Sequence, residues 1–155
     1  MNVFKAILFL LFYFPLNSYN QLAHVKLAET PVINLKRGEQ IIATIKFEIA
    51  REFHIMSDNP GIENFLPTTF KIEPVKEIEF GKIIFPASST FKIKGTEEIF
   101  NVFDSTIIIK IPVSAGKKVV KGKYESKGNL FYQACDNRKC YFPKEFKFPV
   151  TIIVK

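Results

Sequence analysis

The stretch GNLFYQACDNRKCYFP, residues 128–143, holds both cysteines of the 155-residue chain, Cys135 and Cys140. Aromatic, apolar segments run into and out of the polar residues DNRK, a pattern typical of two strands joined by a tight turn. Opposite residues in an antiparallel hairpin have α-carbons about 4.5–5.5 Å apart, and a disulfide spans about 4.4–6.8 Å. The spacing therefore permits a Cys135–Cys140 disulfide.

Such a bond has two interpretations, a structural clip or a redox pair. Closing so small a ring stabilises a fold by only about 2 kcal/mol, and scaffolds that depend on disulfides usually carry many more cysteines. Spacing alone leaves the two interpretations open. Arg138 and Lys139 favour a thiolate, Asp136 opposes one, and a hairpin offers no helix N-terminus to lower a thiol pKa. We therefore expect the pair to wait for a partner's thiolate rather than to attack first.

The run YQACDNRKCYFP, residues 132–143, resembles the cysteine hairpin of the N-terminal periplasmic domain of DsbD, the bacterial thiol:disulfide interchange protein (disulfide bond corrector family). In that family an aromatic residue, Gln and a small residue precede the first cysteine, and Tyr and Pro follow the second. The matching positions here are Tyr132, Gln133, Ala134, Cys135, Asp136, Cys140, Tyr141 and Pro143. Weaker likeness extends to residues 53–55, 66–68 and 84–86. Because no transmembrane bundle or thioredoxin-like domain follows, we expect a stand-alone exported chain.

The resemblance implies an all-β, immunoglobulin-like β-sandwich that acts in thiol–disulfide exchange, and it favours activity as a protein-disulfide reductase. A DsbD-like or CcdA-like membrane electron transporter, or a thioredoxin-fold protein, would reduce the pair. The clients would be periplasmic disulfide isomerases or proteins of cytochrome c biogenesis. Cys140 would form the mixed disulfide and Cys135 would resolve it, with no metal or organic cofactor. The competing interpretation is a secreted binding module with an inert clip.

Further site residues follow from the same resemblance. Those expected to support the cysteines or to dock partners are Tyr132, Gln133, Asp136, Tyr141 and Phe142. A cap that shields the disulfide is expected between Pro86 and Gly95, with Phe91 covering the sulfurs, because exchange rates depend on access. The alternative is that Phe91 is an ordinary core residue at the start of a strand.

The first twenty residues have the anatomy of a signal peptide. Lys5 closes a short basic segment, residues 6–16 are apolar, and residues 17–20 form a polar exit. The apolar run is shorter than the roughly 20 residues of a membrane span; a buried N-terminal strand is the alternative. Cleavage near residues 18–20 would leave one periplasmic or secreted domain, residues 21–155, in a compartment where disulfides persist. We expect it to be monomeric, without membrane insertion.

The chain carries 22 Lys and Arg against 15 Asp and Glu, a net charge of +7. The lysines are scattered rather than clustered, which argues against nucleic-acid binding. The only histidines are His24 and His54; a zinc site would need further ligands, and the two cysteines are better explained together. We expect His54 to be a packed core residue. Phe131 and Phe142 are candidates for an exposed docking surface.

The rest of the chain is predicted to form strands. Residues 41–49 alternate between apolar and polar side chains, the period of a half-buried strand. The continuous β-branched run 105–111 is expected to be buried on both faces, and residues 57–61 form a turn cluster. Further predicted strands are residues 53–56, 69–72, 77–80, 82–85, 91–94, 97–102, 118–132 and 146–154. Many short strands without a helical segment after residue 20 predict a β-sandwich.

Overall fold

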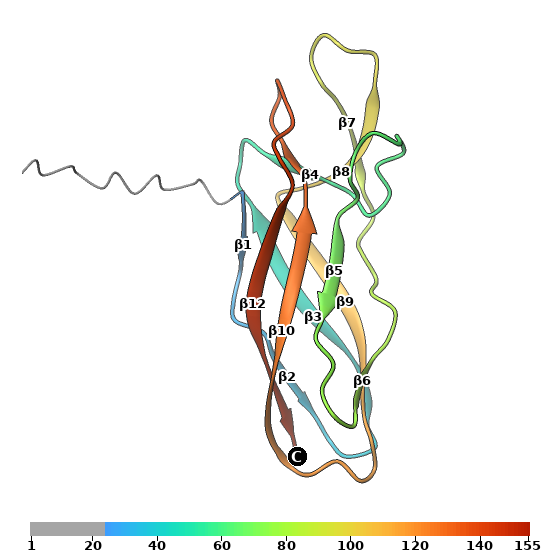
Figure 1. Cartoon of the computed structure of the whole chain (residues 1–155), viewed down its shortest axis with the longest axis vertical. Coiled ribbons are helices and arrows are strands. Elements are labelled where there is room, and N and C mark those ends of the chain that lie inside the picture. The colour runs from blue at the N-terminus through green and yellow to red at the C-terminus, as the bar shows by residue number, and fades with distance from the viewer. Residues whose placement is uncertain (1–23) are drawn as a thin grey trace, which may run out of the picture.

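The computed structural model describes residues 24–155, and the predicted signal segment 1–20 lies outside that range. The described chain is all-β and forms twelve strands that run mostly along the long axis of the molecule (Figure 1). No helix within this range is long and apolar enough to cross a membrane. The all-β prediction is confirmed.

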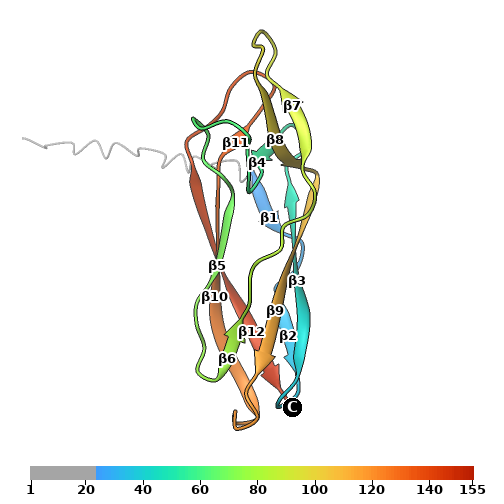
Figure 2. The ribbon, with the colours of Figure 1, turned by 90° about the vertical axis from the view of Figure 1, so that its right-hand side faces the viewer.

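Two four-stranded sheets form the layers of an immunoglobulin-like sandwich (Figure 2). The first has the order β1-β3-β9-β6 and the second the order β2-β12-β10-β5. All pairings are antiparallel except that of β2 with β12. The strands of the first sheet are β1 (Val25–Leu27), β3 (Gln40–Ile49), β9 (Thr106–Ala115) and β6 (Ile78–Phe80). Those of the second are β2 (Val32–Leu35), β12 (Lys144–Val154), β10 (Gly122–Tyr132) and β5 (Thr69–Ile72).

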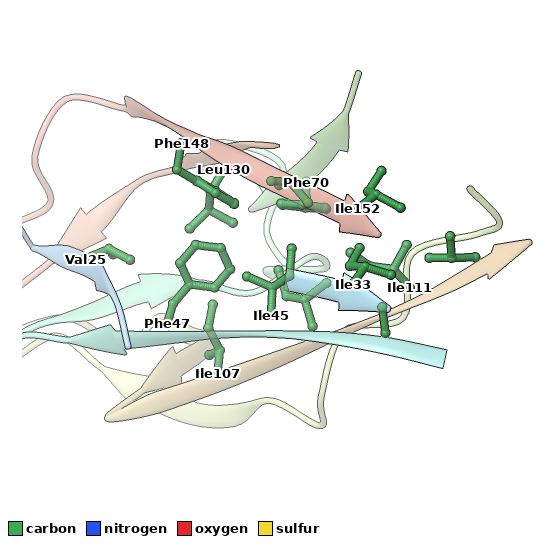
Figure 3. Close-up of a cluster of buried hydrophobic side chains, with 14 of the residues drawn as sticks. Val25, Ile33, Ile45, Phe47, Phe70, Ile107, Ile111, Leu130, Phe148 and Ile152 are labelled. Carbon is green, nitrogen blue, oxygen red and sulfur yellow. The ribbon is translucent and has the colours of Figure 1, made fainter. Parts of the chain in front are cut away.

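The main core lies between these layers, where Phe47 of β3 meets Phe70 and Phe148 of the opposite sheet edge-on (Figure 3). Gly128 makes room for this cluster. It lies directly opposite Phe148 in the β10–β12 ladder, and a Cβ atom at Gly128 would lie 2.5 Å from Cε2 of the Phe148 ring. The absent side chain therefore lets the Phe148 ring fold across its neighbouring strand.

Strand β9 corrects one prediction. Ile107, Ile109 and Ile111 are buried, but Ile108 between them is 44% exposed. The run is therefore buried on one face only, because no strand within residues 24–155 forms a further layer over the outer face of the first sheet. Isoleucine is nevertheless favoured at such positions, since its β-branched side chain suits a strand whichever face it occupies.

A third sheet lies at one end of the sandwich, with the order β11-β4-β8-β7 (Figure 2). Its strands are β11 (Ala134–Cys135), β4 (His54–Met56), β8 (Ile99–Asp104) and β7 (Ser89–Lys92). Two breaks in the chain create it. Phe53 N–H donates to the carbonyl of Ala50 in a turn after β3, and Ser105 adopts a φ of 56° between β8 and β9. These breaks let the chain leave the first sheet and pair anew.

Most of the predicted strands are confirmed within a few residues, one is wrong, and two strands were missed. Residues 82–85 are not a strand, because only an isolated bridge between Ile84 and Lys110 forms there. Strands β1 and β2 were not predicted. The tight DNRK turn is confirmed, because Cys135 and Cys140 face each other in an isolated antiparallel bridge and Asp136 N–H donates to the Lys139 carbonyl at 2.9 Å. The long strands stop short of this turn, since the ladder between β10 and β12 ends at Tyr132 and Lys144. The whole segment 133–143 forms the tip between them.

Candidate functional site

The tip holds a formed disulfide between Cys135 and Cys140, with the two α-carbons 3.9 Å apart. This separation is shorter than the range expected from the sequence. After Tyr132 the chain does not fold straight back, because β11 pairs with β4 in the third sheet. The return segment is fixed to β11 by a hydrogen bond from Tyr141 N–H to the Ala134 carbonyl, 2.8 Å long. Sheet pairing therefore anchors the first cysteine, and the turn positions the second.

Asp136 organises the turn between the cysteines. Its Oδ1 accepts hydrogen bonds from the backbone N–H groups of Arg138 and Lys139 at 2.7 and 2.8 Å. Its Oδ2 accepts from the Tyr141 hydroxyl at 2.7 Å. The Tyr141 hydroxyl and then the two backbone donors lower the pKa of Asp136 to about 2. The turn is thus built around a carboxylate that stays ionised at neutral pH.

Gln133 links three segments around the tip. Its backbone carbonyl accepts from Met56 N–H at 3.0 Å. The side-chain Oε1 accepts from Leu66 N–H at 3.3 Å, and Nε2 donates to the Tyr141 carbonyl at 3.2 Å. Tyr132, just before it, is buried in the main core, and that burial raises the pKa of its hydroxyl. Both residues hold the cysteine loop on the sandwich.

The two sulfur-bearing residues differ in access. Cys135 is fully buried in a second apolar cluster with Met56, Phe100 and Val102. Cys140 is only partly buried and packs against the outside of that cluster. Cys140 is therefore the more accessible of the two residues, and exchange rates depend on access.

Aromatic side chains surround the tip. Phe142, two residues after Cys140, is 91% exposed. The ring of Tyr141 packs against those of His24 and Phe53, with centroids 5.1 and 5.7 Å away, and the Lys139 ammonium lies 5.0 Å above it. Phe131, in contrast, lies half-buried within β10. Phe142 is thus the large apolar side chain that the cysteine loop presents to solvent.

Phe91 lies in β7 and packs against the cluster that contains Cys135, as Cys140 also does. The structure therefore places it against the apolar cluster that holds Cys135, in the segment where the sequence predicts the cap. Its ring lies against the His54 ring, with centroids 3.7 Å apart. The covering role assigned to Phe91 stays a prediction.

Sequence reasoning expected His54 to be a packed residue and gave it no part in the site. The structure confirms that it is buried, but places it directly opposite Cys135 across the β4–β11 pair. Asp104 of β8 lies opposite His54 on the other side and was not singled out at all. Residues 54, 104 and 135 meet through long-range pairing, which no local sequence pattern could have indicated.

Comparisons with known proteins agree with this geometry. The family model described as "Thiol:disulfide interchange protein DsbD, N-terminal" matches residues 23–152. Among solved structures, the N-terminal periplasmic domain of ScsB from Proteus mirabilis is similar, with 13% identity and a TM-score of 0.52 over 81% of this chain. This chain covers 44% of that one.

The N-terminal domain of Neisseria meningitidis DsbD, solved in the reduced form, is 18% identical with a TM-score of 0.45, over 70% of this chain and 74% of that one. No curated protein sequence is similar enough to this chain to count as a match. The family match spans nearly all of the described residues and includes both cysteines. The chain belongs to the family of the N-terminal domain of the thiol:disulfide interchange protein DsbD.

Proposed function

We propose that this chain is a periplasmic carrier of reducing equivalents, which receives two electrons at the Cys135–Cys140 disulfide and passes them to client disulfides. Membership of the DsbD N-terminal family supports thiol–disulfide interchange in general. The observation that carries the proposal is the formed disulfide itself, with Cys135 fully buried and Cys140 partly exposed beside the exposed Phe142. A bond that serves only as a clip gains nothing from such one-sided access.

In this proposal the donor thiolate attacks Cys140 in line with the disulfide, and Cys135 leaves as a thiolate with the electron pair. A second donor thiol then releases Cys140, so that the pair becomes a dithiol after taking up two electrons and two protons. In the second half-cycle the Cys140 thiolate attacks a client disulfide. Cys135 then attacks Cys140, which restores the internal bond and releases the reduced client.

The donors would be a DsbD-like or CcdA-like membrane electron transporter or a thioredoxin-fold protein, and the clients would be other thioredoxin-fold proteins. The exposed Phe142, with the partly exposed Tyr141 next to it, would supply the docking surface, since aromatic side chains are typical interface anchors. Phe91 would limit access until a partner docks. The chain would work as a monomer, exported through its predicted signal peptide.

Trapping of mixed disulfides tests this assignment. The Cys135→Ala variant, incubated with an oxidised thioredoxin-fold protein, should accumulate a covalent complex through Cys140, because the resolving thiol is missing. The Cys140→Ala variant should trap little, since Cys135 is buried. A complex with Cys140→Ala alone would reverse the roles. With neither variant trapping a partner, the pair would be an inert clip.

A further inference from the structure

Three residues form a row across neighbouring strands of the third sheet. Cys135 of β11 lies directly opposite His54 of β4, and His54 lies directly opposite Asp104 of β8. Side chains of directly opposite residues stand on the same face of a sheet, with Cβ atoms about 4.5–5.5 Å apart. A thiol-bearing residue, an imidazole and a carboxylate are therefore neighbours on the face that holds the disulfide.

In the oxidised protein, the ring nitrogen Nε2 of His54 has no hydrogen-bond partner among residues 24–155. The residue is 6% exposed, and its Nε2 is buried without a hydrogen-bond partner. Buried side-chain nitrogens nearly always have a hydrogen-bond partner, so a buried nitrogen without one needs an explanation. The disulfide provides one, because a disulfide carries no proton to donate, whereas the Cys135 thiol of the reduced protein does.

Burial favours a neutral imidazole at His54, and a neutral imidazole can accept a proton. Burial is the main influence and lowers the pKa of His54, while the carboxylates of Asp104 and Asp136 oppose that shift. Arg51 and Glu52 line the same cavity of about 190 Å³, together with His54, Phe91, Asp104 and Asn137. The neighbouring strand β7 contributes no ionisable side chain to this cavity.

We propose that His54 is the general base that takes the proton from Cys135 when Cys135 resolves a mixed disulfide on Cys140. This inference rests on the proposed function. The Cys135 S–H bond breaks, and its proton moves to Nε2 of His54. The sulfur then bonds to Cys140 Sγ, and the client sulfur leaves with the electron pair. The cysteine pair is oxidised by two electrons and the client is reduced by two.

The surroundings fit each stage of that step. A thiol buried among apolar side chains ionises reluctantly, so an adjacent base has most to contribute at Cys135. The Asp104 carboxylate would stabilise the imidazolium that forms, and it is held by a 2.8 Å hydrogen bond from the Ser89 hydroxyl. The cavity that His54 lines offers the route by which the proton then leaves to solvent.

A single-turnover reaction with dithiobis(nitrobenzoate) separates the two chemical steps. Attack by Cys140 on this small disulfide releases one coloured thiolate, and attack by Cys135 on the resulting mixed disulfide releases the second. In the His54→Gln variant the first phase should be unchanged. The second phase should slow by about 100-fold, at the low end of what a general base contributes.

The pH dependence distinguishes this role from a structural one. In the wild type the rate of the second phase should rise to a plateau with a midpoint below about pH 6.5, the ordinary pKa of histidine. In His54→Gln the rate should instead keep rising through about pH 8, where thiols ionise unaided. Asp104→Asn should move the midpoint to lower pH, because it removes a carboxylate that raises the pKa of His54. This variant provides a second test if His54→Gln folds poorly.

His24→Gln is the matched control, because His24 is also buried with an unpartnered ring nitrogen but lies outside the row. It should leave the second phase and its midpoint unchanged. If the second phase in His54→Gln is as fast as in the wild type and has the same pH profile, His54 is not the general base. The proposed carrier function would still stand. A wild-type protein that releases neither thiolate would overturn the proposed function, and this inference with it.

Discussion

The Asp136 carboxylate should make the cysteine turn sensitive to acid, and Asp136→Asn is the substitution that measures it. Asparagine keeps the size of the side chain and removes the charge that accepts three hydrogen bonds, from Tyr141, Arg138 and Lys139. We therefore expect the variant to have a lower free energy of unfolding than the wild type at about pH 7.

The size of the effect follows from the pKa of Asp136, which falls from 3.8 to about 2 in the folded protein. Each tenfold change in proton affinity corresponds to about 1.4 kcal/mol, so the fall sets an upper bound of about 2.5 kcal/mol. The turn is at the surface, where water and salt weaken such interactions. We expect Asp136→Asn to lower the free energy of unfolding by about 1 kcal/mol.

The sign of the pH dependence is fixed by the direction of the shift. Because the pKa is lower in the folded than in the unfolded state, the stabilisation is complete above about pH 4 and is lost as the pH falls to about 2. Urea unfolding of the oxidised proteins at several pH values measures the difference between wild type and variant. This difference should shrink toward zero between about pH 4 and pH 2.

Asp58→Asn is the control for this experiment, because Asp58 is an exposed carboxylate in another loop. It should change the free energy of unfolding by less than about 0.5 kcal/mol at every pH. A difference between wild type and Asp136→Asn that stays constant from neutral to acid pH would refute the reasoning. So would a variant as stable as the wild type at about pH 7.

Three further substitutions test other parts of the account. Gly128→Ala should lower the free energy of unfolding by about 1–3 kcal/mol through overpacking against Phe148, whereas Gly116→Ala, whose added Cβ would meet no atom closer than 3.4 Å, should be nearly neutral in urea unfolding. Phe142→Ala should leave stability unchanged, because the side chain is 91% exposed. It should slow exchange with a thioredoxin-fold protein but not with dithiobis(nitrobenzoate), and equal slowing of both would argue against docking. Phe91→Ala should speed reduction of the disulfide by a small dithiol, and an unchanged rate would remove Phe91 from the cap.

The sequence was sufficient for features that depend on local patterns. The alternation of residues 41–49 located β3, and residues 69–72 coincide with β5. The cysteine spacing permitted the disulfide that the structure contains. In contrast, the pattern of 105–111 was misleading because isoleucine suits an exposed strand face as well as a buried one.

Features that depend on pairing between distant segments could not be predicted. The parallel pairing of β2 with β12 and the departure of β11 toward β4 each join residues far apart in the sequence. Strand β2 has only four residues and follows Pro31, so its period is too short to recognise. The row of Cys135, His54 and Asp104 arises from these pairings and has no local signature.

The reduction potential of the Cys135–Cys140 bond tests the central claim most directly. The oxidised protein is equilibrated with a reduced thioredoxin-fold protein of known potential, and the fraction of dithiol is measured by thiol alkylation. A carrier should be reduced at a potential clearly above about −300 mV. A bond that stays intact in this mixture, with a potential below about −300 mV, would be a structural clip and would contradict the account.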